Sequence, residues 1–135
     1  MVSCKENKAS KAISGWWSID TVIYQGYDLK YCANNSITFD KNTVMLSTTH
    51  HRCPEIIETW DENGIWDLYA KEDSIQLKIN TKNRMFNGTY NIQFYKDPKK
   101  KLLKMKITSD SIYIICRKGM FCYDCEKSLV NDLTK

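Results

Sequence analysis

Apolar and polar residues alternate along most of the chain between Ile13 and Lys118. A period of two is typical of strands that bury one face and expose the other. The first such run begins at the Trp16-Trp17 pair, and its expected inner face consists of Trp17, Ile19, Thr21 and Ile23. The runs predicted as strands lie near residues 16–23, 37–39, 44–48, 56–60, 66–70, 75–79, 86–95, 103–107 and 112–116.

Turn-forming residues separate these runs at short intervals. The segment 61–64 ends in Asn63-Gly64, a dipeptide that favours a hairpin turn because both central residues adopt a positive φ. The run Phe86 to Tyr95 shows the clearest alternation and places several aromatic residues on one face. We therefore expect a meander of about eight or nine antiparallel strands that closes into a barrel or a sandwich.

This pattern indicates an all-β domain spanning residues 13–118. Residues 1–12 are polar, rich in lysine and without periodicity, which predicts a flexible N-terminal tether. Residues 119–135 lose the alternation and contain Cys122 and Cys125. We therefore expect a C-terminal tail that is irregular or forms a short helix. A chain of 135 residues is long enough for one such core.

The arrangement resembles the calycin superfamily, and most closely the lipocalin-like domains of Bacteroidetes lipoproteins. The resemblance rests on Gly15-x-Trp17 at the head of the meander, on the segment Phe86 to Tyr90, and on Arg117 at the end of the last strand. It implies a barrel of eight or nine strands, with Trp17 at the closed end and the basic side chain of Arg117 packed over its ring. Gly15, Trp17 and Arg117 are the expected structural signature.

Two functions fit such a barrel. In the first, the barrel mouth binds a small apolar or amphipathic ligand. The residues expected to line that site are Phe39, Trp60, Trp66, Tyr90 and Phe94. In the second, the barrel is filled by these side chains, and its end loops and tail contact a protein partner, as in an inhibitor or immunity protein. A cavity of several hundred cubic ångströms would favour the first function.

The N-terminal residues Val2-Ser3-Cys4, followed by Lys5-Glu6, resemble the processing site of a bacterial lipoprotein. A lipid on Cys4 would tether the barrel to a membrane, since each buried acyl methylene contributes about 0.8 kcal/mol. This resemblance implies a location in the bacterial cell envelope. The alternative is an ordinary cytoplasmic start with an unmodified cysteine.

Six cysteines in this chain suggest an oxidising compartment if they pair. With Cys4 lipidated, five remain, so at least one thiol is left over. Cys32 with Cys53, and Cys116 with Cys122 or Cys125, are the candidate disulfides, and spacing alone does not choose between them.

Charge and motifs argue against several other functions. The net charge of +4 is modest and the lysines are scattered along the chain. Nucleic-acid binding usually needs a dense basic stripe. The chain shows no nucleophile elbow, phosphate-binding loop or zinc-protease motif, so we expect neither an enzyme nor a cofactor. His50, His51 and Cys53 lack the paired spacing of a structural zinc site, and we expect no metal.

Overall fold

In the computed structural model, the described residues are 4–29, 36–46, 61–99 and 102–119. These ranges form one helix and nine strands. In chain order they are α1 (Cys4–Ile13), β1 (Gly15–Tyr24), β2 (Tyr27–Asp28), β3 (Ser36–Asp40), β4 (Thr43–Met45), β5 (Asn63–Lys71), β6 (Ser74–Thr81), β7 (Gly88–Lys96), β8 (Leu103–Thr108) and β9 (Ile112–Lys118).

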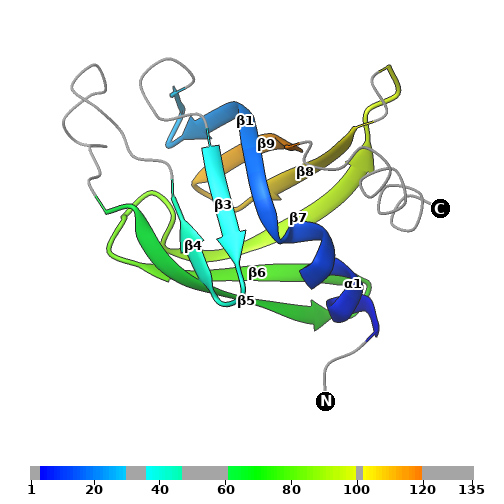
Figure 1. The fold of residues 1–135 in the computed structure, drawn as a ribbon. Coiled ribbons are helices and arrows are strands. Elements are labelled where there is room, and N and C mark those ends of the chain that lie inside the picture. Colours follow the sequence, from blue (N-terminus) through cyan, green and yellow to red (C-terminus); the bar gives the residue numbers. More distant parts are fainter. Residues whose placement is uncertain (1–3, 30–35, 47–60, 100–101, 120–135) are drawn as a thin grey trace.

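The strands form an antiparallel meander that closes on itself (Figure 1). Strand β1 pairs with β3 on one side and with β9 on the other, from Trp17 opposite Lys118 to Tyr24 opposite Ile112. Strand β2 adds a short hairpin at the end of β1. Eight strands therefore form a closed barrel with one extra strand, which confirms the predicted all-β meander.

The inner faces of the strands supply the core. Trp17, Leu77 and Met105 have no solvent exposure, and Phe39 and Ile114 have 1%. These positions alternate with polar residues along each strand, so the two-residue period of the sequence places apolar side chains inside the barrel.

The inner face of β1 differs from the prediction at its second half. Ile19 lies opposite Cys116 whereas Thr21 lies opposite Ile115, so Asp20 is an extra residue in a β-bulge. The bulge shifts the alternation by one position. As a result Val22 is buried at 2% exposure and Ile23 is exposed at 36%, the reverse of what strict alternation predicted.

The predicted hairpin turn at Asn63-Gly64 is wrong. Both residues belong to β5, where Asn63 pairs with Met45 and Gly64 pairs with Val44. Gly64 is needed because its neighbours are close and not because it forms a turn. A Cβ at this position would lie 2.9 Å from Cβ of Thr81. Close approach of the neighbouring strand β6 explains the glycine.

The predicted tether at residues 1–12 is also wrong for the part that the structure describes. Helix α1 begins at Cys4, and Ala9, Ala12 and Ile13 are buried in the core. These three residues follow the i, i+3, i+4 spacing of one helix face. Two of them are alanines, so the apolar stripe is too weak to stand out among the lysines.

Some predictions lie outside the described residues. These are the strand at 56–60 with Trp60, the tail at 120–135, and the cysteines Cys32, Cys53, Cys122 and Cys125. Among the described residues, no helix has the length and apolar character needed to cross a lipid bilayer.

Candidate functional site

Three of the residues expected to line a ligand site lie inside the barrel and pack tightly. The rings of Phe39 and Trp66 meet edge to face, with centroids 5.3 Å apart. The indole N–H of Trp66 donates a hydrogen bond to the carbonyl oxygen of Asp40 at 2.7 Å, and Tyr90 is 3% exposed. The aromatic side chains of Phe39, Trp66 and Tyr90 thus fill space in the core and contact other residues of it.

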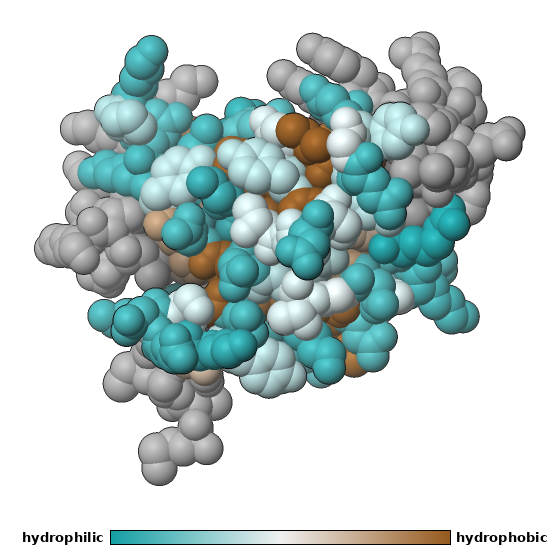
Figure 2. Space-filling model, turned by 180° about the vertical axis from the view of Figure 1, so that it is seen from behind, coloured by the Kyte–Doolittle hydropathy of each residue, from teal (hydrophilic) through white to brown (hydrophobic). Residues whose placement is uncertain are grey.

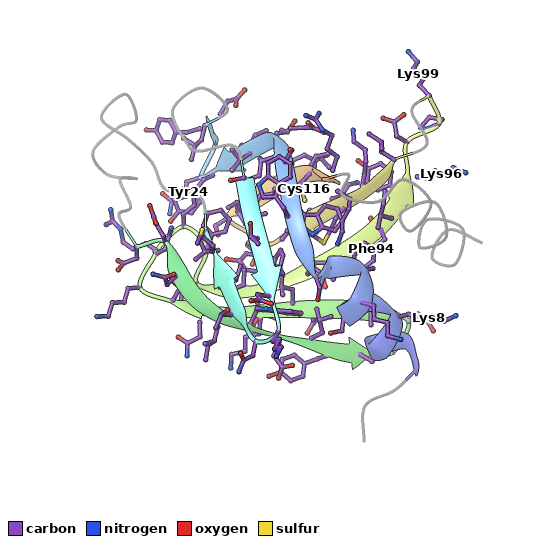
Figure 3. All side chains as sticks on the ribbon, viewed as in Figure 1. Lys8, Tyr24, Phe94, Lys96, Lys99 and Cys116 are labelled. Atoms are coloured by element: carbon purple, nitrogen blue, oxygen red, sulfur yellow. The ribbon has the colours of Figure 1, made fainter. Side chains whose placement is uncertain are left out.

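Phe94 occupies a different position. It is only partly buried, and it borders a groove of about 900 Å³ between α1, the turn from β5 to β6, and β7. We call this the helix-side groove. Phe94 and Lys8 of α1 lie at the same end of the barrel (Figure 3). Phe94 is therefore a residue that was predicted to line a ligand site and that lies in the helix-side groove.

The helix-side groove exists because β6 is shorter than its neighbour at this end. Pairing between β6 and β7 reaches only Ile75 and Ile92, while β7 continues to Lys96 along β8 alone. Helix α1 contacts β5 and stands beside the gap that this leaves. The inner face of the barrel reaches the surface at this point.

The lining of the helix-side groove combines apolar and polar side chains, from the inner faces of β6 and β7 and from the outer faces of β7, β8 and β9. Ile75, Ile92 and Phe94 come from the inner faces of β6 and β7. The charged residues of the lining are Lys8 from α1, Asp73 from the turn between β5 and β6, and Lys106 from β8. The ammonium group of Lys106 lies 5.9 Å from the ring centroid of Tyr113, which is also part of the lining.

Tyr95 adds a hydrogen-bonding group to the lining of the helix-side groove. Burial raises the pKa of Tyr95 above its ordinary value, and the lowering effect of Lys104 is smaller. The phenol therefore keeps its proton at neutral pH and can both donate and accept a hydrogen bond.

The predicted contact between Arg117 and Trp17 is wrong, and the neighbouring Lys118 makes it. Trp17 is fully buried, and the ammonium group of Lys118 lies 5.0 Å from its ring centroid. Arg117 faces outward and donates a hydrogen bond to Asp20 at 2.8 Å. Alternation along β9 decides this, since Cys116 and Lys118 share the inner face.

Lys118 also secures the end of α1. Its ammonium group donates hydrogen bonds to the carbonyl oxygen of Ala12 at 2.7 Å and to that of Ser14. The indole N–H of Trp17 donates to the carbonyl oxygen of Ile13 at 2.7 Å. These bonds satisfy carbonyls that the end of a helix leaves without partners, and the positive charge favours that end.

Gly15, the remaining member of the expected signature, links α1 to β1. Its φ of +118° lies in a region that favours glycine, and a Cβ here would lie 3.2 Å from the Lys118 ammonium nitrogen. Sequence reasoning missed Lys118 because Arg117 and Lys118 are both basic and both lie at the end of β9. Only the strand register shows which of the two points inward.

The predicted disulfide from Cys116 does not form. Cys116 is a free cysteine with no solvent exposure, and its thiol lies 3.6 Å from the carbonyl oxygen of Met105. Its side chain points into the core between β8 and β9. Burial raises the pKa of the Cys116 thiol strongly, with a smaller contribution from Asp20.

Comparison of the chain with protein-family models, with curated proteins and with solved structures found no match in any of the three.

Proposed function

We propose that this protein binds a small apolar or amphipathic molecule in the helix-side groove and has no catalytic role. The observation that carries the proposal is the continuity of the groove with the inner face of the barrel at Ile75, Ile92 and Phe94. A volume of about 900 Å³ lies within the range of small-molecule sites, which combine an apolar lining with a few polar groups.

The lining suggests how such a molecule would lie. Its apolar part would cover Ile92 and Phe94, which removes apolar surface from water. Its polar part would lie near Lys8 and Lys106. The two lysines outnumber the one carboxylate of the lining, Asp73, and favour an anionic group on the ligand, because a charged hydrogen bond is stronger than a neutral one.

A lipocalin-like assignment and a lipoprotein role in the cell envelope belong to the same proposal. The closed meander and the cation over the ring of Trp17 support the first. The sequence around Cys4 supports the second, and α1 begins at that residue. A lipid on Cys4 would hold the helix end of the barrel, and with it the groove, near a membrane that contains amphipathic molecules.

Fluorescence titration with cis-parinaric acid tests ligand binding. We expect saturable binding, and we expect the affinity to fall by at least about tenfold in Phe94→Ala, which removes an apolar wall of the groove. Lys8→Glu should weaken binding of the acid more than binding of its methyl ester, because only the acid carries the charge.

Tyr69→Ala is the matched control, since Tyr69 is an exposed aromatic residue on β5 outside the helix-side groove. It should leave the affinity unchanged. Absence of saturable binding by the wild-type protein, or equal affinity in Phe94→Ala and wild type, would contradict the proposal.

A protein-interaction role is the second candidate. It is favoured by exposed aromatic residues, among them Tyr27 at 45% and Tyr113 at 39% exposure, because aromatic side chains are enriched at interfaces. Native mass spectrometry of protein purified from its own source separates the two, since a retained small molecule supports the first and a bound polypeptide the second.

A further inference from the structure

A second groove, of about 840 Å³, lies on the outer face of the barrel. It runs across β1, β8 and β9, and we call it the outer-face groove. Its lining includes Trp16, Asp20, Asp97, Lys104 and Arg117. Unlike the helix-side groove, it has a lining dominated by polar side chains.

Seen from behind the view of Figure 1, the molecule is mostly hydrophilic with small apolar areas (Figure 2).

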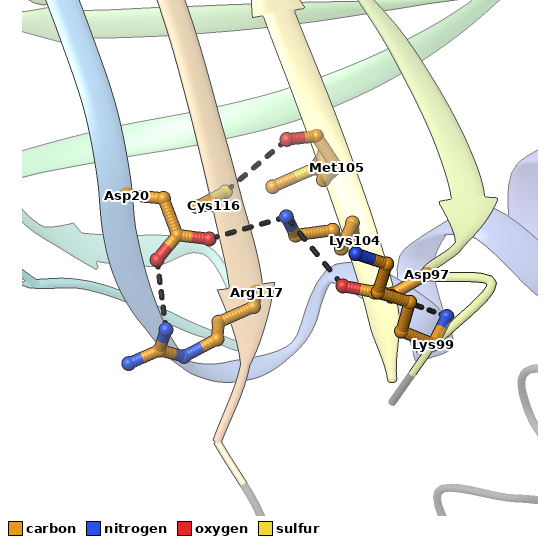
Figure 4. A network of polar contacts seen from close by, with 7 residues as sticks. All are labelled: Asp20, Asp97, Lys99, Lys104, Met105, Cys116 and Arg117. Carbon is orange, nitrogen blue, oxygen red and sulfur yellow. Dashed lines mark hydrogen bonds and ion pairs between the residues drawn. The ribbon is translucent and has the colours of Figure 1, made fainter. Parts of the chain in front are cut away.

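Asp20 is the centre of a charged network in the outer-face groove (Figure 4). One of its carboxylate oxygens lies 2.8 Å from the guanidinium group of Arg117, and the other lies 3.4 Å from the ammonium group of Lys104. Lys104 also lies 3.9 Å from the carboxylate of Asp97. The four side chains hold each other in place across three strands and a turn.

The β-bulge brings a second residue of β1 to the outer face beside Asp20. Strict alternation already places Asp20 on that face with Trp16 and Ser18, and the bulge turns Thr21 outward as well. Asp20 is the extra residue between Ile19 and Thr21, and both Asp20 and Thr21 line the outer-face groove. Bulges commonly redirect a side chain next to a functional site. The ion pair of Arg117 contributes little to stability, because the Arg117 side chain is 45% exposed.

Trp16 supplies a flat aromatic surface in the same groove. It is 40% exposed, and its carbonyl oxygen accepts a hydrogen bond from the N–H of Gly119 at 2.8 Å. A Cβ on Gly119 would lie 2.2 Å from the Trp16 ring, so the ring packs directly on the backbone of Gly119. A large exposed indole held in this way offers a pre-positioned binding surface.

The charge balance limits the class of ligand. The lining contains two carboxylates and two cations that already neutralise each other. A charged ligand would have to displace one of these partners, whereas a neutral ligand with many hydroxyl groups can hydrogen bond to both. Carboxylate and guanidinium groups can each bond to two adjacent hydroxyls. The partially positive C–H groups of a sugar ring match the negative face of an indole.

We propose that the outer-face groove binds a neutral carbohydrate, with a sugar ring against Trp16 and its hydroxyl groups on Asp20 and Arg117. This site is separate from the helix-side groove, and the proposal does not depend on the function proposed above.

Isothermal titration calorimetry tests the carbohydrate proposal. The ligands are soluble neutral oligosaccharides of glucose, galactose, mannose, xylose and N-acetylglucosamine. We expect saturable binding of at least one of them and a loss of affinity of at least about tenfold in Trp16→Ala. Asp20→Asn should also weaken binding, since it removes the charged acceptor and frees Arg117. Oligogalacturonate should bind more weakly than the best neutral sugar.

Circular dichroism melts identify variants that fail to fold. Asp20→Asn changes a carboxylate to an amide of the same shape, and it provides the second readout if Trp16→Ala is unfolded. Tyr69→Ala, an equally exposed aromatic on β5, is the matched control and should bind as the wild type does. No saturable binding of any neutral sugar overturns the proposal. Tighter binding of oligogalacturonate than of every neutral sugar, or unchanged affinity in folded Trp16→Ala and Asp20→Asn, also overturns it.

Discussion

Lys118 and Arg117 are adjacent in the sequence but lie on opposite faces of β9. Lys118 is 8% exposed and contacts the Trp17 ring and the last carbonyls of α1. Arg117 pairs with Asp20 on the outer face. At the level of single residues, therefore, two similar charges have different roles, one in joining the helix to the barrel and one in the outer-face groove.

Replacing Lys118 by methionine should lower the free energy of unfolding by about 2–4 kcal/mol. Methionine keeps most of the length of the side chain but donates no hydrogen bond, so the carbonyl oxygens of Ala12 and Ser14 lose their charged donor. Urea denaturation followed by tryptophan fluorescence measures the change. Arg117→Ala is the matched control and should cost less than about 1 kcal/mol. The reverse order of the two effects would contradict this assignment.

The thiol of Cys116 should resist chemical modification in the folded protein. Burial raises its pKa above the ordinary value of 9.0. At pH 9 the folded chain keeps the proton that an unfolded chain begins to release, so this residue makes the fold less stable as the pH rises above 9. Iodoacetamide at pH 9 should label Cys116 only after denaturation, as read by peptide mass mapping.

An exposed cysteine provides the reference for that experiment. Ser111 lies in the exposed turn between β8 and β9, and Ser111→Cys should be labelled at pH 9 without denaturant. If Cys116 reacts in the folded protein as fast as this reference does, its burial is disproved.

Among the elements, β1 and β5 show where local signals and tertiary pairing disagree. Strict alternation along β1 was correct as far as Ile19, and the bulge at Asp20 then exchanged the inner and outer faces. The Asn63-Gly64 dipeptide has a strong local preference for a turn, yet both residues pair with β4. Pairing with a neighbouring strand overrode the local preference in this case.

Gly64→Ala tests the close contact of β5 with β6. An added Cβ would lie 2.9 Å from Thr81 and 3.0 Å from the carbonyl oxygen of Asn80, so one of the strands must shift. We expect the free energy of unfolding to fall by about 1–3 kcal/mol. Ile65→Ala, at the next position and 55% exposed, should cost less than about 1 kcal/mol. Equal stability of Gly64→Ala and wild type in a urea titration would rule out the close contact.

At the scale of the whole molecule, closure of the barrel leaves the two grooves outside the packed core. The inner space holds the core, including Phe39, Trp66 and Tyr90. The helix-side groove therefore lies at the gap beside β7, and the outer-face groove lies on the outer wall beside the bulge of β1. Helix α1 completes the first of these and is itself held by Lys118.

The sequence by itself determined the all-β class, the meander and the burial of Trp17, because a two-residue period can bury its apolar face only in a sheet. It did not determine which basic residue lies over Trp17, the bulge at Asp20, or the helix at α1. Each of these depends on the register between strands or on contacts between distant segments, and neither follows from local spacing. The tertiary structure alone decided them, and both grooves are built from those same features.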